Sequence, residues 1–237
     1  MYDTEMKLNH QIIQFLEFQL QALLPSKEDR NRLNSSANSE QYIPAAMLSV
    51  LVQYLSGLKA ISCLLNKGFV SQTRGIFQTL GDDYEDIIFL SLPSQDGLLT
   101  PLHQEYLRSA AGDDCRGCYS PVSRCELRNM IRQAKNINHN VFQLYPKKQA
   151  LQVLRPQGAK PCSVDVAIEL HRHFAYKAVL LTVLTAKVAG DMDVMRACLN
   201  YRAHLEMIDP NTADLINTPV YSQHAGDRSV PHYVAMR

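Results

Sequence analysis

Three cysteines near the middle of the chain have the residue type and spacing for a metal site. Cys115 and Cys118 are separated by two residues, so a loop can turn both thiolates towards one tetrahedral zinc ion. Cys125 is the candidate third ligand, and the fourth would come from His103, His139 or Cys162. The alternative is a set of ordinary free or buried thiols, because the sequence has no second close pair of Cys or His. We expect no cofactor other than this candidate zinc.

A stretch rich in histidine is a candidate for acid–base chemistry. Glu169 and His173 stand one helical turn apart and could share a ligand or a proton. A carboxylate-bridged di-iron bundle needs Glu-x-x-His, and here Arg172 stands where that histidine would be. The alternative places His173 on a solvated polar face and His171 at the margin of the core.

Arg132 and His139 form a third candidate catalytic pair. An Arg followed within a few residues by a His resembles the pair used by some helical ribonucleases of bacterial defence systems. In a chain with eight His and many Arg, such a spacing also arises by chance. A nuclease would further need both side chains in a cleft shared by two subunits.

A polar row follows one flank of a predicted helix. It consists of Arg74, Gln78 and Glu85, whereas Asp82, Asp83 and Asp86 are expected to point largely away from the core. One hypothesis is a polar pocket that this row forms together with Lys177 and Glu169. The alternative is a structural ion pair at the core margin, which contributes little net stability.

Lys177 is unusual because its helical position lies among apolar residues, namely Leu170, Phe174, Leu181 and Leu184. We consider three roles for it: an ion pair with an acid such as Glu85, a side chain that extends to the surface, or a pocket lysine with a lowered pKa. Convergence of Lys177 and His173 with the polar row would favour an enzyme or a ligand site. Scattering of these residues would favour association.

The elements that must position these residues are helices. Residues 44–92 contain two long apolar segments joined at Gly68, and the first repeats apolar residues at steps of three and four: Met47, Leu51, Tyr54, Leu58, Ile61 and Leu65. A second apolar row, Leu48, Val52 and Leu55, predicts that this helix lies inside a bundle. The second helix is expected to resume at Phe69 and to end at Pro93.

Caps and breakers predict the other helices. We expect helices over Met6–Leu24, over Pro101–Ala111 with Thr100 as its N-cap, and from Ser120 towards Phe142. Ser163 is predicted to cap a helix that ends at Gly190, and Asp191 begins a last helix through Met207. Residues 26–42 and 145–162 are polar or rich in proline and are predicted to be irregular.

These patterns predict an all-α protein. The chain should form a single-domain bundle of about six to seven helices over residues 1–209, in which the hairpin 44–92 packs against 163–190. Residues 210–237 lack a sustained period and are expected to be a strap or a flexible tail.

Composition narrows the function classes. The 237 residues are 46% hydrophobic and 20% charged, with a net charge of +1, so charge does not indicate binding to nucleic acid or to an anionic membrane. The first residues carry no secretory signal, and Lys59 and Lys187 interrupt the most apolar windows, so we expect no membrane span. Six irregularly spaced Cys indicate a reducing cytoplasm.

The stretch LLNKGFVSQTRGIFQTLGDDYEDIIFL resembles a signature of bacterial all-helical proteins that are grouped as domains of unknown function. In that signature an apolar helix ends at Gly, an aromatic residue follows, and Arg opens the motif Arg-x-x-x-Glu. Gly68, Phe69 and Arg74 match it, whereas Gln78 stands in place of the Glu. The resemblance implies a helical cytoplasmic protein and supplies no activity.

The leading hypothesis is association, as a homo-oligomer or with a protein partner, because apolar helix surface is plentiful and no complete catalytic set is present. The alternatives are a hydrolytic enzyme such as a helical ribonuclease of a defence or toxin system, and a bundle that binds a small ligand or a metal.

Overall fold

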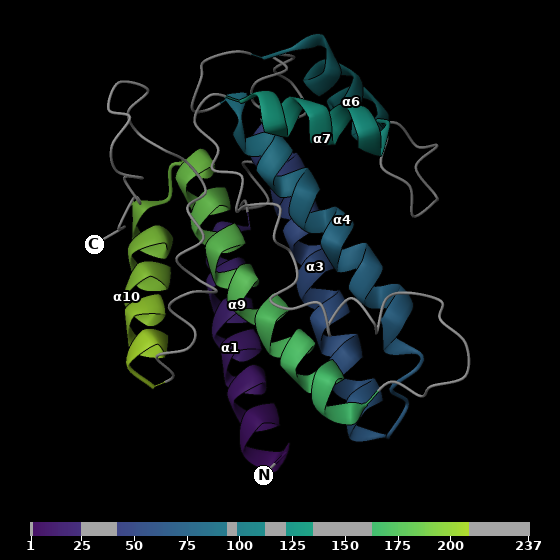
Figure 1. Ribbon diagram of the computed structural model, residues 1–237. Helices are drawn as coiled ribbons and strands as arrows, with labels where there is room; N and C mark the ends of the chain where they lie inside the picture. The colour runs from purple at the N-terminus through teal and green to yellow at the C-terminus, as the bar shows by residue number, and fades with distance from the viewer. Residues whose placement is uncertain (1, 25–41, 94–98, 112–121, 135–162, 209–237) are drawn as a thin grey trace, which may run out of the picture.

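The computed structural model describes residues 2–24, 42–93, 99–111, 122–134 and 163–208. Within these ranges the chain forms seven helices and no strand, so the prediction of an all-α bundle is confirmed (Figure 1). The helices are α1 (Tyr2–Leu23), α3 (Tyr42–Asn66), α4 (Thr73–Ser91), α6 (Pro101–Ala111), α7 (Arg124–Gln133), α9 (Val164–Ala189) and α10 (Met192–Ile208).

The predicted hairpin is formed by α3 and α4. Gly68 adopts the left-handed conformation (φ 78°), which is accessible to glycine without strain, and α3 ends just before it. The N–H of Phe69 then bonds back to the carbonyl of Leu64, at 2.8 Å. The second helix begins at Thr73 and not at Phe69 as predicted, because residues 67–72 form this hydrogen-bonded turn.

The outer face of α3 differs from the prediction. Leu51, Tyr54 and Leu58 are buried as expected, but Leu48 is only half-buried and Val52 is 41% exposed. The helix therefore lies at the surface of the bundle, and of its second apolar row only Leu55 belongs to the core. By length and hydropathy α3 could also cross a membrane, a test that core helices of soluble proteins pass as well. The expectation of no membrane span stays a prediction.

The centre of the bundle is α9, which packs against α1, α3, α4 and α10. Almost every side chain from Ala167 to Ala186 is buried, so the nearly uniform apolar character of this segment matches a helix surrounded on all sides. Both predicted ends are confirmed, since Ser163 occupies the N-cap position and the left-handed Gly190 ends the helix. The predicted packing of the hairpin against α9 is confirmed too.

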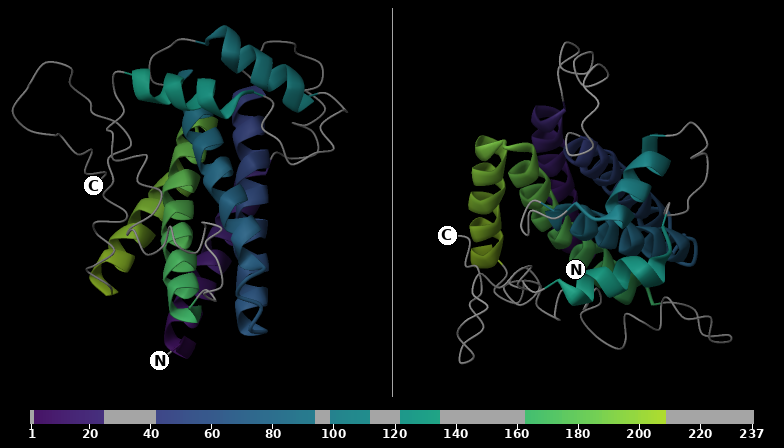
Figure 2. Two further views of the ribbon diagram at one scale, coloured as in Figure 1. Left: turned by 45° about the vertical axis from the view of Figure 1, so that its right-hand side comes forward. Right: turned by 90° about the horizontal axis from the view of Figure 1, so that it is seen from above.

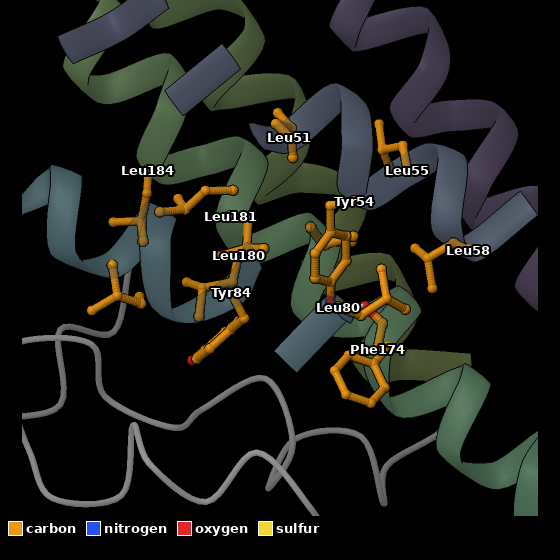
Figure 3. Packing of buried hydrophobic residues seen from close by; sticks show 14 of the residues in the cluster. Leu51, Tyr54, Leu55, Leu58, Leu80, Tyr84, Phe174, Leu180, Leu181 and Leu184 are labelled. Atoms are coloured by element: carbon orange, nitrogen blue, oxygen red, sulfur yellow. Dashed lines mark hydrogen bonds between the residues drawn. The ribbon is translucent and has the colours of Figure 1, made fainter. Parts of the chain in front are cut away.

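Aromatic side chains join α3, α4 and α9. The Tyr54 hydroxyl donates a hydrogen bond to the Phe174 carbonyl at 3.0 Å, and the rings of Phe77 and Phe174 stack with centroids 5.7 Å apart. Figure 3 shows Tyr54 and Phe174 among the buried leucines of the three helices. Each fully buried side chain of this size contributes roughly 1.5–3 kcal/mol to folding.

Two shorter helices, α6 and α7, lie across one end of the bundle (Figure 2). The structure confirms the predicted α6, where Thr100 Oγ1 accepts the His103 backbone N–H at 3.4 Å. The predicted helix from Ser120 begins instead at Arg124, after Ser123 at the N-cap position. Its expected continuation to Phe142 lies outside the described residues.

Candidate functional site

The described part of the chain has its densest group of charges where α7 crosses the C-terminal half of α4. On α4, Asp82, Glu85 and Asp86 share one face because they are spaced three and four residues apart. On α7, Arg124 and Arg128 lie one turn apart and face these carboxylates. We call these five residues, together with Asp83, the α4–α7 charge cluster.

Each arginine holds one buried carboxylate. Arg124 binds Asp86 in a bidentate manner, with N–H···O distances of 2.8 and 3.1 Å, and also donates to the Asp82 carbonyl at 2.9 Å. The Arg128 Nε–H group donates to both Glu85 oxygens, at 2.8 and 2.9 Å. The planar guanidinium suits such carboxylate binding, and charged hydrogen bonds are stronger than neutral ones.

The neighbouring helix α6 reaches the same charge cluster through Tyr106, which hydrogen-bonds to Asp86. Burial, together with Asp86, raises the pKa of the Tyr106 hydroxyl, so it acts as a neutral donor. Beside it, the His103 ring stacks on Phe89 with centroids 4.0 Å apart. Its Nε2–H group donates to the Phe89 carbonyl at 3.0 Å, and burial lowers the pKa of His103.

Asp83 is the exceptional member of the cluster. Its side chain is 5% exposed, and within the described residues its Oδ2 atom has no hydrogen-bond partner. Burial first, and then the adjacent charge of Asp86, raise the pKa of Asp83 from 3.8 to about 8. Burial likewise raises the pKa of Asp86 to about 6, although Arg124 opposes the shift. A buried acid that stays protonated near neutral pH can donate a hydrogen bond or a proton.

Lys177 of α9 lies in a different environment, at the contact between α9 and α4. Its ammonium nitrogen lies 5.7 Å from the centre of the Tyr84 ring, and the side chain is 1% exposed. Burial lowers the pKa of Lys177 from 10.5 to about 7. Of the three alternatives considered for Lys177, extension to the surface is therefore wrong, and a lowered pKa agrees with its burial. Glu85, its suggested partner, binds Arg128 and lies 3.9 Å from Arg124.

Both histidines of α9 are deeper than predicted. His171 is fully buried, where Asn9 donates to its Nδ1 at 3.0 Å and its Nε2–H group donates to the Leu58 carbonyl at 3.0 Å. Burial lowers the pKa of His171 to about 4, so it is a neutral link between α1, α3 and α9. His173 is also buried, against the edge of Phe174, so the expected position on a solvated face is wrong.

The predicted polar pocket is dispersed over the bundle. Arg74 lies eleven residues before Glu85 on α4, about 16 Å along the helix axis. Gln78 is exposed, Glu169 is half-buried, and Lys177 is buried two turns further along α9 than Glu169. Glu85 alone belongs to the α4–α7 charge cluster. These residues therefore do not gather in one concavity.

The other predicted site residues are only partly within the described chain. Cys125 is an exposed free thiol on α7, but Cys115, Cys118, Cys162 and His139 lie outside the described residues. Arg132 is exposed on α7 and donates to Asn129 at 3.4 Å. Within the described chain no three His, Cys, Asp or Glu side chains are grouped to hold a metal ion. The zinc site and the ribonuclease pair stay predictions.

Sequence reasoning missed Arg124, Arg128 and Tyr106, and the expected exposure of Asp83 and Asp86 is wrong. The available signal was the spacing of two arginines one turn apart, flanked by Leu127 and Ile131, which predicts an amphipathic helix with a basic row. That pattern does not say which carboxylates the row meets.

Two neighbouring helices, α1 and α10, also expose large apolar side chains. Phe18 of α1 is 70% exposed and Met207 of α10 is 75% exposed, while Met192 and Ile208 of α10 are each about half exposed. Phe15 of α1 and Tyr201 of α10 join the two helices, with their rings stacked and the centroids 3.9 Å apart. We call the four exposed residues Phe18, Met192, Met207 and Ile208 the α1–α10 edge. Figures 1 and 2 show α10 at the periphery of the bundle.

No protein-family model matches this sequence, and no curated protein or solved structure is significantly similar to it. The resemblance to helical bacterial proteins stays a prediction.

Proposed function

We propose that this protein acts by association, binding a second copy of itself or another protein through the α1–α10 edge. The observation that carries the proposal is the exposure of Phe18, Met207, Met192 and Ile208 on two adjacent helices. Large apolar side chains that stay exposed on adjacent helices favour an interaction surface, because burying them in a complex removes them from water.

The burial of the ionisable groups supports association over catalysis. His171, His173 and Lys177 are each at most 1% exposed, and Asp86 is hydrogen-bonded to Arg124 and Tyr106. A general acid or base must come within hydrogen-bond distance of its substrate. Groups that are buried to this degree are out of reach of a substrate in solution.

The test is the oligomeric state of variants at the edge. Phe18→Glu and Met207→Glu each place a charge on the proposed surface, where burial in an interface would be costly. The wild-type protein is expected to have a mass above the 26.8 kDa of one chain in light scattering, and both variants should approach 26.8 kDa. If the partner is a different protein, it should co-purify with the wild type and be lost from both variants.

Gln53→Glu is the matched control, because Gln53 is an exposed position of α3 away from the α1–α10 edge. It introduces the same carboxylate and should leave the mass unchanged. A wild-type protein that remains at 26.8 kDa over a wide concentration range, with no co-purifying chain, would contradict the proposal.

A further inference from the structure

The helices α6 and α7 together form a cap on the bundle: α7 is joined to α4 by ion pairs, and α6 packs against α3 and contacts α4 through His103 and Tyr106. The apolar contribution to this junction is limited to five buried side chains: Tyr106, Leu107, Val122, Leu127 and Ile131. By contrast, α3 alone buries eight residues. Because buried apolar surface is the main source of stability, the cap belongs to the less stable part of the fold.

Both cap helices meet α4 at the same carboxylate. Arg124 of α7 binds Asp86 through two hydrogen bonds, and Tyr106 of α6 donates to it as well. Glu85, one residue earlier, is held by arginines of α7 only among the contacts of the described chain. Asp86 therefore links α6 and α7 by contacting both of them, whereas the contacts of Glu85 are with α7.

Releasing the cap would change what α4 presents to solvent. The His103 ring covers one face of Phe89, and Tyr106 lies beside the same ring with centroids 5.8 Å apart. Arg124 and Arg128 neutralise the carboxylates of the cluster. Without α6 and α7, an aromatic ring and a group of uncompensated acids would be exposed on one helix.

We propose that α6 and α7 open as one unit, with Asp86 as their common latch, and uncover Phe89 and the carboxylates of α4 while the bundle stays folded. This device is independent of the association proposed for the α1–α10 edge. Opening of this kind is a sub-global unfolding event, which amide hydrogen exchange measures segment by segment.

The test compares amide exchange in Asp86→Asn and Glu85→Gln, two variants that remove one charge and keep the side-chain shape. Asp86→Asn should accelerate exchange roughly tenfold or more in both α6 and α7, as expected for a lost hydrogen bond to a charged group. Glu85→Gln removes a contact of α7 alone and should still accelerate exchange in both cap helices, by a smaller factor, because the two helices open as one unit and the Arg128–Glu85 pair is the more exposed. Glu17→Gln, at the exposed pair with Lys59, is the control and should accelerate neither.

Three results would overturn the proposal: acceleration of α7 alone in Asp86→Asn, no acceleration in either cap helix, or equal acceleration of α3 and α9. Should Asp86→Asn fail to fold, exchange of the wild type in low urea decides the matter. A common urea dependence of α6 and α7, weaker than that of α9, supports the proposal. Amide exchange that depends on urea differently in α6 and in α7 would contradict the proposal.

Discussion

Two interfaces of α4 bury ionisable groups by different means. Towards α7, Asp86 is buried together with a counter-charge, Arg124, which binds it in a bidentate manner. Towards α9, Lys177 is buried against the Tyr84 ring, and burial lowers its pKa to about 7. The first interface keeps its charge by pairing, and the second reduces its charge by releasing a proton. The comparison shows that one helix can accommodate burial in both ways.

The largest expected effect tests the paired interface. Arg124→Met should lower the free energy of unfolding by roughly 3 kcal/mol, because it leaves Asp86 buried without its main counter-charge. This is the lower end of the range for broken buried pairs, since Arg124 is 25% exposed. Urea denaturation at neutral pH measures the loss. As a control, Arg196→Met removes an exposed pair with Asp193 and should change stability little.

The next prediction tests the interface between α4 and α9, where Lys177 is buried. Lys177→Met should raise the free energy of unfolding by about 2 kcal/mol near pH 6. Because the pKa of Lys177 falls from 10.5 to about 7 on folding, the unfolded chain binds this proton more tightly, and wild-type stability rises with pH across that window. The gain should therefore be full below about pH 7 and should shrink towards pH 10.5. A gain that grows with pH would be incompatible with a buried, partly neutral lysine.

Asp83→Asn should show the opposite dependence on pH. Folding raises the pKa of Asp83 from 3.8 to about 8, so the folded state binds this proton more tightly and wild-type stability falls as pH rises through that window. The variant should gain about 1 kcal/mol above pH 8 and almost nothing near pH 4, since the amide keeps a buried polar group in place. Urea denaturation of the wild type and the variant at both pH values measures the difference in their free energies of unfolding. The same dependence of this free energy on pH in both proteins would contradict a buried acid at position 83.

The smallest expected effect comes from the second arginine of the interface between α4 and α7. Arg128→Met should cost roughly 0.5–1 kcal/mol, less than Arg124→Met, because the Arg128 side chain is 43% exposed and water already screens its pair with Glu85. Denaturation of both variants under one set of conditions provides the ranking. Equal losses would mean that exposure of the arginine does not govern the strength of these pairs.

Local patterns were sufficient to predict much of the fold. The apolar spacing in α3 and α9, and the glycines at their ends, predicted both helices to within a few residues, because these signals act between near neighbours in sequence. They failed at the outer face of α3, where Val52 is exposed. An apolar row shows that a face can be buried, and it does not identify a partner that buries it.

The candidate sites were less predictable. Glu85 and Lys177 were recognised as unusual, but the suggested pair between them is replaced by contacts of Glu85 with Arg128 and of Lys177 with Tyr84. Asp83 and Asp86 were expected in water because acids on a helix are normally solvated. The burial of Asp86 follows from Arg124 of α7 and Tyr106 of α6, which contact it.

The sequence by itself determined that this protein is helical and where most of its apolar faces lie, since both depend on residues three and four positions apart. Only the tertiary structure decided which charges are buried and what neutralises them. Asp86 and Arg124 are 38 positions apart, and His171 and Asn9 are 162 apart. Contacts over such separations depend on how complete helices pack, and no local pattern specifies that arrangement.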